Sequence, residues 1–503
     1  MNLISFITPI LLSFFPILFL VSSNLGERIT FGQISGTIII SGIFSFLATY
    51  IFSKILKNSY KSSIFICWLI IIFFSYGYLI SFLSEITIFQ ESIGRHRYIG
   101  SLFLIITIII FLLIKNSKKP FNNFISPILV SSLILISFNL IQIFIYYSSP
   151  RTEILEILNI EELETTQSLK NKPDVYHIIL DMYPNEKVLQ SRFDFNNLEF
   201  LTEMKDLGFN NFNGRSNYMR TKHSIPSTIN LIHLNELDSN QLKSIQETEW
   251  SFKKSLEGYY AKKLGYKINH LSTNDPDSIL GWMLGDFTRV LVKTSFLRII
   301  EDSPIPINKL WIVKDSSFFN NNLNKLEKIS TDQDSTWTFF YSRPPHPPFI
   351  FNQDGTLRNK KEYDQDFATN LTDTWSENTQ KLYINQIEYV NKELLKTLTK
   401  ILENSKVNPI ILIHSDHGIH NFSGNMGDEK LDNTTEKVLE EHYNTLTTFY
   451  SVDSCEKIDN HEISNVNLIR TILRECFGLN ISNINDNSYW SPRHQNKFIP
   501  VIE

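Results

Sequence analysis

Residues 408–418 read NPIILIHSDHG, in which a short apolar run leads directly into the polar group Ser-Asp-His-Gly. An isoleucine-rich run of this length predicts a strand that is buried on both faces. An adjacent aspartate and histidine, followed by glycine, serve no evident structural purpose at the end of such a strand. Asp416 and His417 are therefore the strongest candidate functional residues in the chain.

Two further apolar runs end in polar residues. VYHIIL (175–180) leads into Asp181, and STWTFFYS (335–342) is followed by a proline-rich segment that contains His346. Both runs predict buried strands. Taken alone, Asp181 is also explained as a turn former or helix cap, and His346 as part of a rigid surface loop.

Helical patterns, such as those at 194–206 and 375–403, alternate with these strands. The alternation predicts an α/β domain with a mostly parallel central sheet, covered by helices on both faces. Active residues of open parallel sheets gather just past the carboxyl ends of the strands. Asp181, Asp416 and His417 are expected to meet there, as oxygen and nitrogen ligands suited to zinc or manganese.

The hydroxyl-rich stretch GRSNYMRTKHSIPSTINLIHL (214–234) predicts a turn and then a helix whose first turn contains Pro226, where proline is tolerated. A threonine or serine at a helix start usually serves as the N-cap. The same position suits a nucleophile, because the helix N-terminus favours an oxyanion and a metal ion lowers the hydroxyl pKa. The residues alone leave both interpretations open.

The 503-residue chain is too long for one ordinary domain, and its mean hydropathy of -0.09 conceals a concentration of apolar residues in the first 150 positions. Each apolar stretch there is close to the ~20 residues that cross a bilayer. The five stretches lie at about 4–25, 30–53, 62–84, 98–114 and 124–147. The first has no basic region or small-residue cleavage site, which argues against a signal peptide. A buried helical core is the disfavoured alternative.

The connecting loops predict the orientation of these spans. Arginines mixed with glutamates occur in the loops after the first and third stretches, whereas the loops after the second and fourth carry Lys54, Lys57, Lys61, Lys115, Lys118 and Lys119. Because positive charge marks the cytoplasmic side, we expect the N-terminus inside and everything after about residue 150 outside. This predicts a transmembrane domain at 1–150, a juxtamembrane helix and linker at 151–172, and an extracytoplasmic catalytic domain at 173–503.

Charge and cysteine content exclude some classes of protein. The net charge of -5 predicts no nucleic-acid partner. Three cysteines cannot form a disulfide framework. Cys455 and Cys476 are able to pair if the C-terminal region faces an oxidising compartment, and the sequence leaves this open.

These elements, in this order, resemble the sulfatase/alkaline-phosphatase superfamily, and most closely the bacterial membrane enzymes of the lipoteichoic acid synthase and phosphoethanolamine transferase type. The resemblance implies five spans, an extracytoplasmic catalytic domain and one divalent metal ion, zinc or manganese, with magnesium possible. Asp181, Asp416 and His417 match the metal ligands, although many of the transferases have glutamate in place of Asp181. His346 matches a histidine implied to bind substrate phosphate or to assist the leaving group.

The nucleophile is identified by the same resemblance. The transferases carry Thr-x-x-Ser-x-Pro, with threonine as nucleophile, and Thr221, Ser224 and Pro226 fit that pattern. The sulfatase signal Cys/Ser-x-Pro-x-Arg would begin at Ser224, but Thr228 stands in place of its arginine. Thr221 is therefore the preferred nucleophile and fourth metal ligand, and Ser224 is the second choice. Arg220 is a candidate for binding an anionic headgroup, although solvation at the surface is the more common role of such a residue.

The resemblance implies a transferase in the cytoplasmic (inner) membrane that moves phosphoglycerol or phosphoethanolamine from a phospholipid to an envelope glycan or lipid. The alternatives are a membrane-bound sulfatase or phosphodiesterase-type hydrolase of sulfate or phosphate esters, an envelope protein without turnover, and a transporter. No Asp-x-x-x-His pair lies within 222–415, which favours a single metal ion. His420 and His442 are spare ligand candidates, each also explained as a solvated surface histidine. The sequence does not specify the donor, the acceptor or the oligomeric state.

Overall fold

The computed structural model describes most of the chain, and the packing of its residues divides it into two compact units. The N-terminal unit comprises Met1–Ser149 and Pro276–Trp311, and the C-terminal unit comprises Pro150–Asp275 and Ile312–Glu503. The described residues are 2–25, 29, 31–84, 86–88, 91–148, 154–157, 172–272, 285–303, 308–358, 375–419, 431, 434–451, 455, 462–491 and 496–501.

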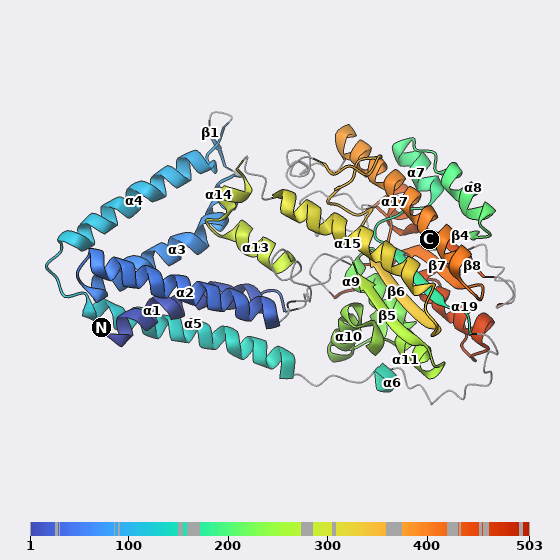
Figure 1. The fold of residues 1–503 in the computed structure, drawn as a ribbon, viewed down its shortest axis with the longest axis horizontal. Helices are drawn as coiled ribbons and strands as arrows, with labels where there is room; N and C mark the ends of the chain where they lie inside the picture. The colour runs from blue at the N-terminus through green and yellow to red at the C-terminus, as the bar shows by residue number, and fades with distance from the viewer. Residues whose placement is uncertain are drawn as a thin grey trace. The chain divides into compact units, whose positions relative to one another are not determined.

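Five long helices make up most of the N-terminal unit (Figure 1). They are α1 (Leu3–Ser22), α2 (Phe31–Ile55), α3 (Ser59–Ser84), α4 (His96–Asn116) and α5 (Asn122–Ser148). All five are long and apolar enough to cross a membrane, which confirms the five predicted stretches. Large apolar side chains such as Phe44, Leu104 and Phe144 are exposed on these helices, a surface that suits lipid better than water.

Two short helices from the second half of the chain also belong to the N-terminal unit. These are α13 (Asp286–Thr294) and α14 (Arg298–Glu301), and α13 packs against α3. They lie inside the range 173–503, which the sequence predicts to be one continuous extracytoplasmic domain.

A seven-stranded sheet forms the centre of the C-terminal unit. In spatial order its strands are β5 (Lys267–Ser272), β6 (Thr336–Ser342), β3 (Val175–Leu180), β7 (Ile410–Ser415), β8 (Asn444–Tyr450), β4 (Asn210–Arg215) and β9 (Glu462–Ser464). Only β8 runs antiparallel to its neighbours, which confirms the predicted mostly parallel sheet. Leu180 of β3 pairs with both Ser342 and Ser415, so the three central strands end in line.

Helices cover both faces of this sheet, as predicted. Because side chains alternate along a strand, β3 directs Ile178 and Leu180 into one core and Val175 and Ile179 into the other. Helices α8 (Leu198–Asp206), α15 (Asn308–Ile329) and α17 (Glu377–Asn404) contribute to the first core. The second core is built with α9 (Thr221–Asn230), α11 (Leu256–Lys263) and α19 (Asn465–Phe477).

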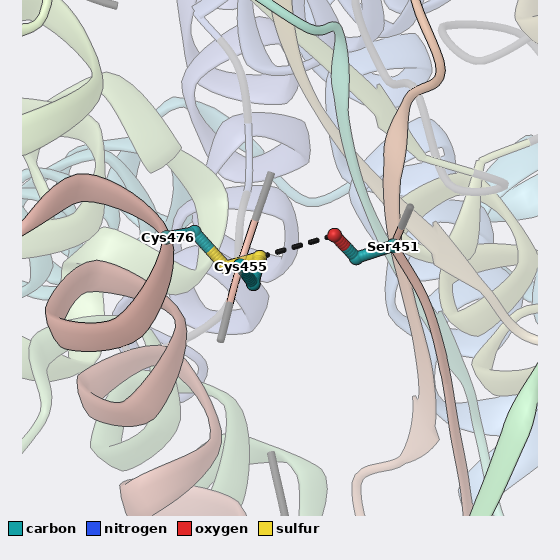
Figure 2. The surroundings of a disulfide bond; sticks show 3 residues. All are labelled: Ser451, Cys455 and Cys476. Atoms are coloured by element: carbon teal, nitrogen blue, oxygen red, sulfur yellow. Dashed lines mark hydrogen bonds between the residues drawn. A yellow bond between two sulfur atoms is a disulfide. The ribbon is translucent and has the colours of Figure 1, made fainter. Parts of the chain in front are cut away.

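A disulfide joins Cys455 to Cys476 of α19, a pairing that the sequence left open (Figure 2). The Ser451 hydroxyl lies 3.1 Å from the Cys455 sulfur. Cys67, in α3, is buried and unpaired. Disulfides persist in oxidising compartments, so this pairing is typical of a domain that lies in such a compartment.

Two local details differ from the sequence interpretation or extend beyond it. Helix α9 begins at Thr221, so Pro226 lies in its second turn and not in its first. The prediction took the proline as the mark of the helix start, whereas Pro226 inside the helix removes only the backbone N–H that would reach the carbonyl of Lys222. Of the predicted juxtamembrane helix, the short α6 (Ile154–Ile157) is described, and residues 158–171 lie outside the described residues.

Candidate metal and active site

Three side chains from two neighbouring strand ends meet at the carboxyl edge of the sheet. Asp181 follows β3, and Asp416 and His417 follow β7. One ligand atom from each lies within 4.8 Å of the others, and all three residues are buried. The in-line ends of β3 and β7 cause this meeting, as the alternation of strands and helices predicted.

The imidazole of His417 lies at the centre of the cluster. Its Nε2 is 3.4 Å from Oδ1 of Asp181, 3.6 Å from Oδ2 of Asp416 and 3.2 Å from the Thr221 hydroxyl. Among the described residues, no group donates a hydrogen bond to Asp181 Oδ1 or Asp416 Oδ2, although both atoms are buried. A buried carboxylate oxygen without a donor is costly, and a cation between these atoms would remove that cost.

The remaining polar atoms of these residues are held by hydrogen bonds. Tyr341 donates its hydroxyl to Oδ2 of Asp181 at 2.6 Å. Oδ1 of Asp416 accepts from the backbone N–H of Met182 at 3.2 Å and of His417 at 2.9 Å. The carbonyl of Gly418 lies 2.8 Å from Nδ1 of His417. Nδ1 therefore donates to this carbonyl, which turns Nε2 toward the cluster.

The electrostatics of the cluster also favour a bound cation. Burial and the neighbouring charge of Asp416 raise the pKa of Asp181 well above its ordinary value, and the bond from Tyr341 and the charge of Arg343 offset only part of this. Two carboxylates, one imidazole nitrogen and one hydroxyl form a donor set suited to zinc or manganese. The residues present therefore fit a divalent metal ion.

The serine and glycine of Ser-Asp-His-Gly have structural roles beside the ligands. The Ser415 hydroxyl accepts the N–H of Tyr183 and donates to the His417 carbonyl, at 2.7 and 2.8 Å. A Cβ on Gly418 would lie 2.2 Å from the carbonyl oxygen of Glu441, because this backbone runs directly against residues 441–442. Glycine is therefore required immediately after His417.

The two candidate nucleophiles occupy different environments. Thr221 is the first residue of α9, and its hydroxyl faces His417 as described above. Ser224 lies one turn further along, is buried, and donates its hydroxyl to the backbone carbonyl of Asp416 at 2.5 Å. The geometry brings the Thr221 hydroxyl, and not that of Ser224, to the imidazole of His417.

The structure also places His346 and Arg220. The backbone N–H of His346 donates to the Asp181 carbonyl at 3.1 Å, which ties the proline-rich loop to the end of β3. Its Nδ1 lies 2.6 Å from the Pro347 carbonyl, and burial together with the charge of Arg343 lowers its pKa to about 3. Arg220 is the N-cap residue of α9, and its Nε donates to the Ser491 carbonyl at 3.2 Å.

Sequence reasoning missed Tyr341 and Arg343 and misread one histidine. Tyr341 pairs with Ile179 across β6 and β3, so a polar residue near the end of an adjacent strand was the available signal. The interpretation of His442 as a solvated surface residue is wrong: it is buried, with its ring 5.8 Å from that of Trp490. Burial lowers the pKa of His442 to about 3. His420, the other spare candidate, lies outside the described residues.

Comparison with known proteins identifies similar folds. No protein-family model and no curated protein matches this sequence. Among solved structures, the chain is similar to the C-terminal periplasmic domain of EptC from Escherichia coli in complex with Zn, at 11% identity and a TM-score of 0.43, covering 68% of this chain and 96% of that one. It is similar to the integral membrane protein lipooligosaccharide phosphoethanolamine transferase A from Neisseria meningitidis, at 11% identity and a TM-score of 0.41, covering 95% of both chains. The lipoteichoic acid synthase LtaP from Listeria monocytogenes matches at 13% identity and a TM-score of 0.36, covering 69% of this chain and 85% of that one. At such low identities and TM-scores, we draw no conclusion about activity from these similarities.

Proposed function

We propose that this protein is a membrane-anchored, metal-dependent transferase that moves a lipid-derived headgroup, phosphoglycerol or phosphoethanolamine, to an envelope acceptor. The observation that carries the proposal is the convergence of four atoms at one edge of the sheet. Three are potential ligands from Asp181, Asp416 and His417, and the fourth is the hydroxyl of Thr221 at the start of a helix.

The cofactor in this proposal is one divalent ion, zinc or manganese, held by Asp181, Thr221, Asp416 and His417. When bound, the ion supplies positive charge that lowers the pKa of the Thr221 hydroxyl and stabilises negative charge on a phosphoryl oxygen. The buried Oδ1 of Asp181 and Oδ2 of Asp416 support this assignment, because neither accepts a hydrogen bond among the described residues and a cation would stabilise both.

In the first step, Thr221 loses its hydroxyl proton and Oγ1 attacks the phosphorus of the phospholipid headgroup. The bond between phosphorus and the diacylglycerol oxygen breaks, and that oxygen takes up a proton. Arg220 and His346 hold or orient the anionic substrate, and the N-terminal end of α9 favours the negative charge of the phosphoryl group.

In the second step, an acceptor hydroxyl attacks the phosphorus of the phospho-threonine. The bond to Thr221 Oγ1 breaks, the acceptor loses its proton, and Thr221 regains one. Attack by water instead of an acceptor alcohol would make the same site a hydrolase, so the two activities differ only in which hydroxyl reaches the intermediate.

The proposed location is the cytoplasmic membrane, with the N-terminus inside and the C-terminal unit outside. Five helices long and apolar enough to span keep the enzyme in the plane that holds its phospholipid donor. The lysine-rich loops support the orientation, and the Cys455–Cys476 disulfide supports an oxidising environment for the C-terminal unit.

The test uses the full chain, because residues 285–303 pack with the N-terminal helices. The protein is placed in bilayers of phosphatidylethanolamine and phosphatidylglycerol with isotope-labelled headgroups, loaded with zinc or manganese, and analysed by intact-mass and peptide mass spectrometry. We expect a labelled phosphoethanolamine or phosphoglycerol adduct on Thr221 that is absent in Thr221→Ala. Ser224→Ala is the matched control and should retain the adduct.

The other outcomes contradict separate parts of the proposal. An adduct on Ser224 would leave an enzyme with a different nucleophile. Metal bound with no adduct on either residue would overturn the covalent mechanism. Release of free headgroup phosphate with a saturating acceptor present would identify a hydrolase and overturn the transferase assignment.

A further inference from the structure

Residues 285–303 complete the N-terminal unit, although residues 150–275 of the C-terminal unit precede them in the chain. This segment contains α13 and α14, which lie beside α3 (Figure 1). None of the residues assigned to the candidate active site belongs to it.

Helix α13 is anchored by apolar packing. Phe287 is buried in a core with Ile17, Leu20 and Val21 near the end of α1, and Leu291 packs against the same core. The backbone at the end of α13 also approaches α3 very closely, because a Cβ on Gly77 would lie 2.1 Å from the carbonyl oxygen of Lys293.

Polar contacts fix the segment that follows. The N–H of Phe296 donates to the Phe73 carbonyl at 2.7 Å, and its ring lies 4.7 Å from that of Tyr76. Arg298 donates to the Gly77 carbonyl and the Ser81 hydroxyl of α3, at 3.0 and 2.6 Å.

A third contact links the segment to α4. Asp302 lies 2.7 Å from Nε2 of His96, the first residue of α4. Ile299 packs with Ile99 of α4 in a small apolar core. The segment is therefore bound to three of the helices that are long and apolar enough to span a membrane.

Several apolar side chains of the segment are exposed among the residues that the structure describes. Val290, Leu297 and Ile300 are 41%, 38% and 36% exposed. Where Ile299 packs on Ile99 of α4, the flanking Tyr98 and Leu102 of α4 are also exposed. Exposed apolar side chains on both sides of this contact, one of them on a candidate span, indicate a lipid environment for the segment as well.

The length and charge of the segment indicate that it lies at the membrane surface and does not cross the bilayer. Its helices have nine and four residues, far fewer than the ~20 needed to cross a bilayer, so neither of them spans it. Arg289 and Lys293 lie among the apolar residues, and such long cationic side chains are typical of the headgroup boundary.

We propose that residues 285–303 form an interfacial membrane segment, with Val290, Leu297 and Ile300 in contact with phospholipid at the boundary between headgroups and acyl chains. The C-terminal region is thus attached to the bilayer a second time, independently of the connection after α5. The occupant of this apolar surface is lipid, and neither water nor a second protein.

Spin labels on the full chain in phospholipid vesicles test this proposal. Labels are attached to Val290→Cys and Ile300→Cys in a Cys67→Ser background, with the Cys455–Cys476 disulfide intact. Leu104→Cys on α4, 62% exposed, is the lipid-facing control, and Leu198→Cys on α8, 55% exposed, is the control for an exposed leucine of the C-terminal unit. Leu297→Cys supplies a third position if either variant fails to fold.

The measured quantities are the collision rates of each label with oxygen and with a water-soluble nickel chelate. We expect oxygen collisions less frequent than at Leu104→Cys, which lies near the middle of α4 where oxygen is more concentrated, and nickel collisions on the order of tenfold lower than at Leu198→Cys, since a polar chelate is excluded from the apolar layer. Nickel collisions as frequent as at Leu198→Cys would overturn the proposal. Low collision rates with both reagents would also overturn it, because they identify a surface covered by protein.

Discussion

Two clusters of buried polar side chains are built around strands β3 and β7, and they differ in whether all of their polar atoms have hydrogen-bond partners. The inner cluster joins His177, Glu257, Trp337 and His414. The outer cluster is the candidate metal site, formed by residues that directly follow the ends of the same two strands. Both contain histidine and a carboxylate, so residue type alone does not separate them.

The inner cluster is complete in itself. Glu257 accepts from Nδ1 of His177 at 2.9 Å and from the indole of Trp337 at 2.8 Å. The Nε2 atoms of His177 and His414 are 2.8 Å apart, so one carries a proton that the other accepts, and Nδ1 of His414 donates to the Ser415 carbonyl. The ring nitrogens of both histidines, the Trp337 indole and the Glu257 carboxylate therefore all have hydrogen-bond partners.

The outer cluster is incomplete. It has two carboxylates, an imidazole whose Nε2 faces them, and two buried oxygens without a donor among the described residues. The comparison teaches that the completeness of the hydrogen bonds, and not the presence of histidine and a carboxylate, distinguishes a structural cluster from a ligand site.

The largest expected effect is the loss of activity in Asp416→Asn. Asparagine can still accept the two backbone N–H bonds, but it removes one charge that would hold the metal. We expect kcat/KM to fall by about 10³-fold or more, equivalent to about 4 kcal/mol, while the metal-free protein stays at least as stable, since a repulsion is relieved. Steady-state kinetics and metal stoichiometry provide the measurement. Normal activity in Asp416→Asn would mean that the outer cluster is structural too.

Glu257→Gln tests the inner cluster and should affect stability, not chemistry. The substitution replaces the carboxylate that accepts from His177 and Trp337 by a neutral amide, which weakens two buried hydrogen bonds and costs roughly 3 kcal/mol in the free energy of unfolding. Denaturant unfolding is the measurement, and Glu199→Gln, on the exposed surface of α8, is the control. Metal content and activity per folded molecule should remain those of the unmodified protein. A stability equal to that of Glu199→Gln would show that the inner cluster is not needed for folding.

Added metal should raise the free energy of unfolding through the outer cluster and not through the inner one. Zinc or manganese at 100 times its dissociation constant should stabilise the metal-free protein by about 2.7 kcal/mol. This increment should persist in Glu257→Gln, disappear in Asp181→Asn, and be reversed by a chelator. Thermal unfolding with and without metal measures it. An increment that survives in Asp181→Asn would place the metal elsewhere.

The smallest expected effect is that of Ser224→Ala, because the hydroxyl of Ser224 supports the Asp416 carbonyl and is not directed at the carboxylates. Loss of this hydrogen bond should cost about 1 kcal/mol of stability. The variant should keep most of its activity, in contrast to Thr221→Ala, and parallel kinetic and unfolding measurements on the two variants give the comparison. A greater loss of activity in Ser224→Ala than in Thr221→Ala would reverse the assignment of the nucleophile.

Much of the fold was predictable because its signals are local. Length and hydropathy identify the five long helices, and short apolar runs identify β3, β6 and β7. The meeting of Asp181 with Asp416 and His417 followed from the common edge of parallel strands. That the Thr221 hydroxyl joins them depends on where α9 starts, and the sequence left its role open.

What the sequence did not reveal depends on contacts between distant residues. No local sequence pattern in either segment predicts that Phe287 packs on Ile17. Helix α13 is also too short and too charged to be recognised as a membrane element. The bond from Tyr341 to Asp181 requires knowing which strand lies beside β3. The partner of His177 could not be predicted either, because Glu257 lies on a helix that covers the sheet.

The late position of residues 285–303 has a consequence for biosynthesis. The ribosome makes all five long helices, and then residues 150–275, before Phe287 exists to fill its place beside Ile17 and Leu20. The N-terminal unit therefore cannot complete its packing until the ribosome has synthesised Phe287. Its parts assemble in a different order from that in which they are synthesised. A nascent chain that stalls before residue 285 would leave the apolar surface for Phe287 uncovered, in a form that membrane quality control can recognise.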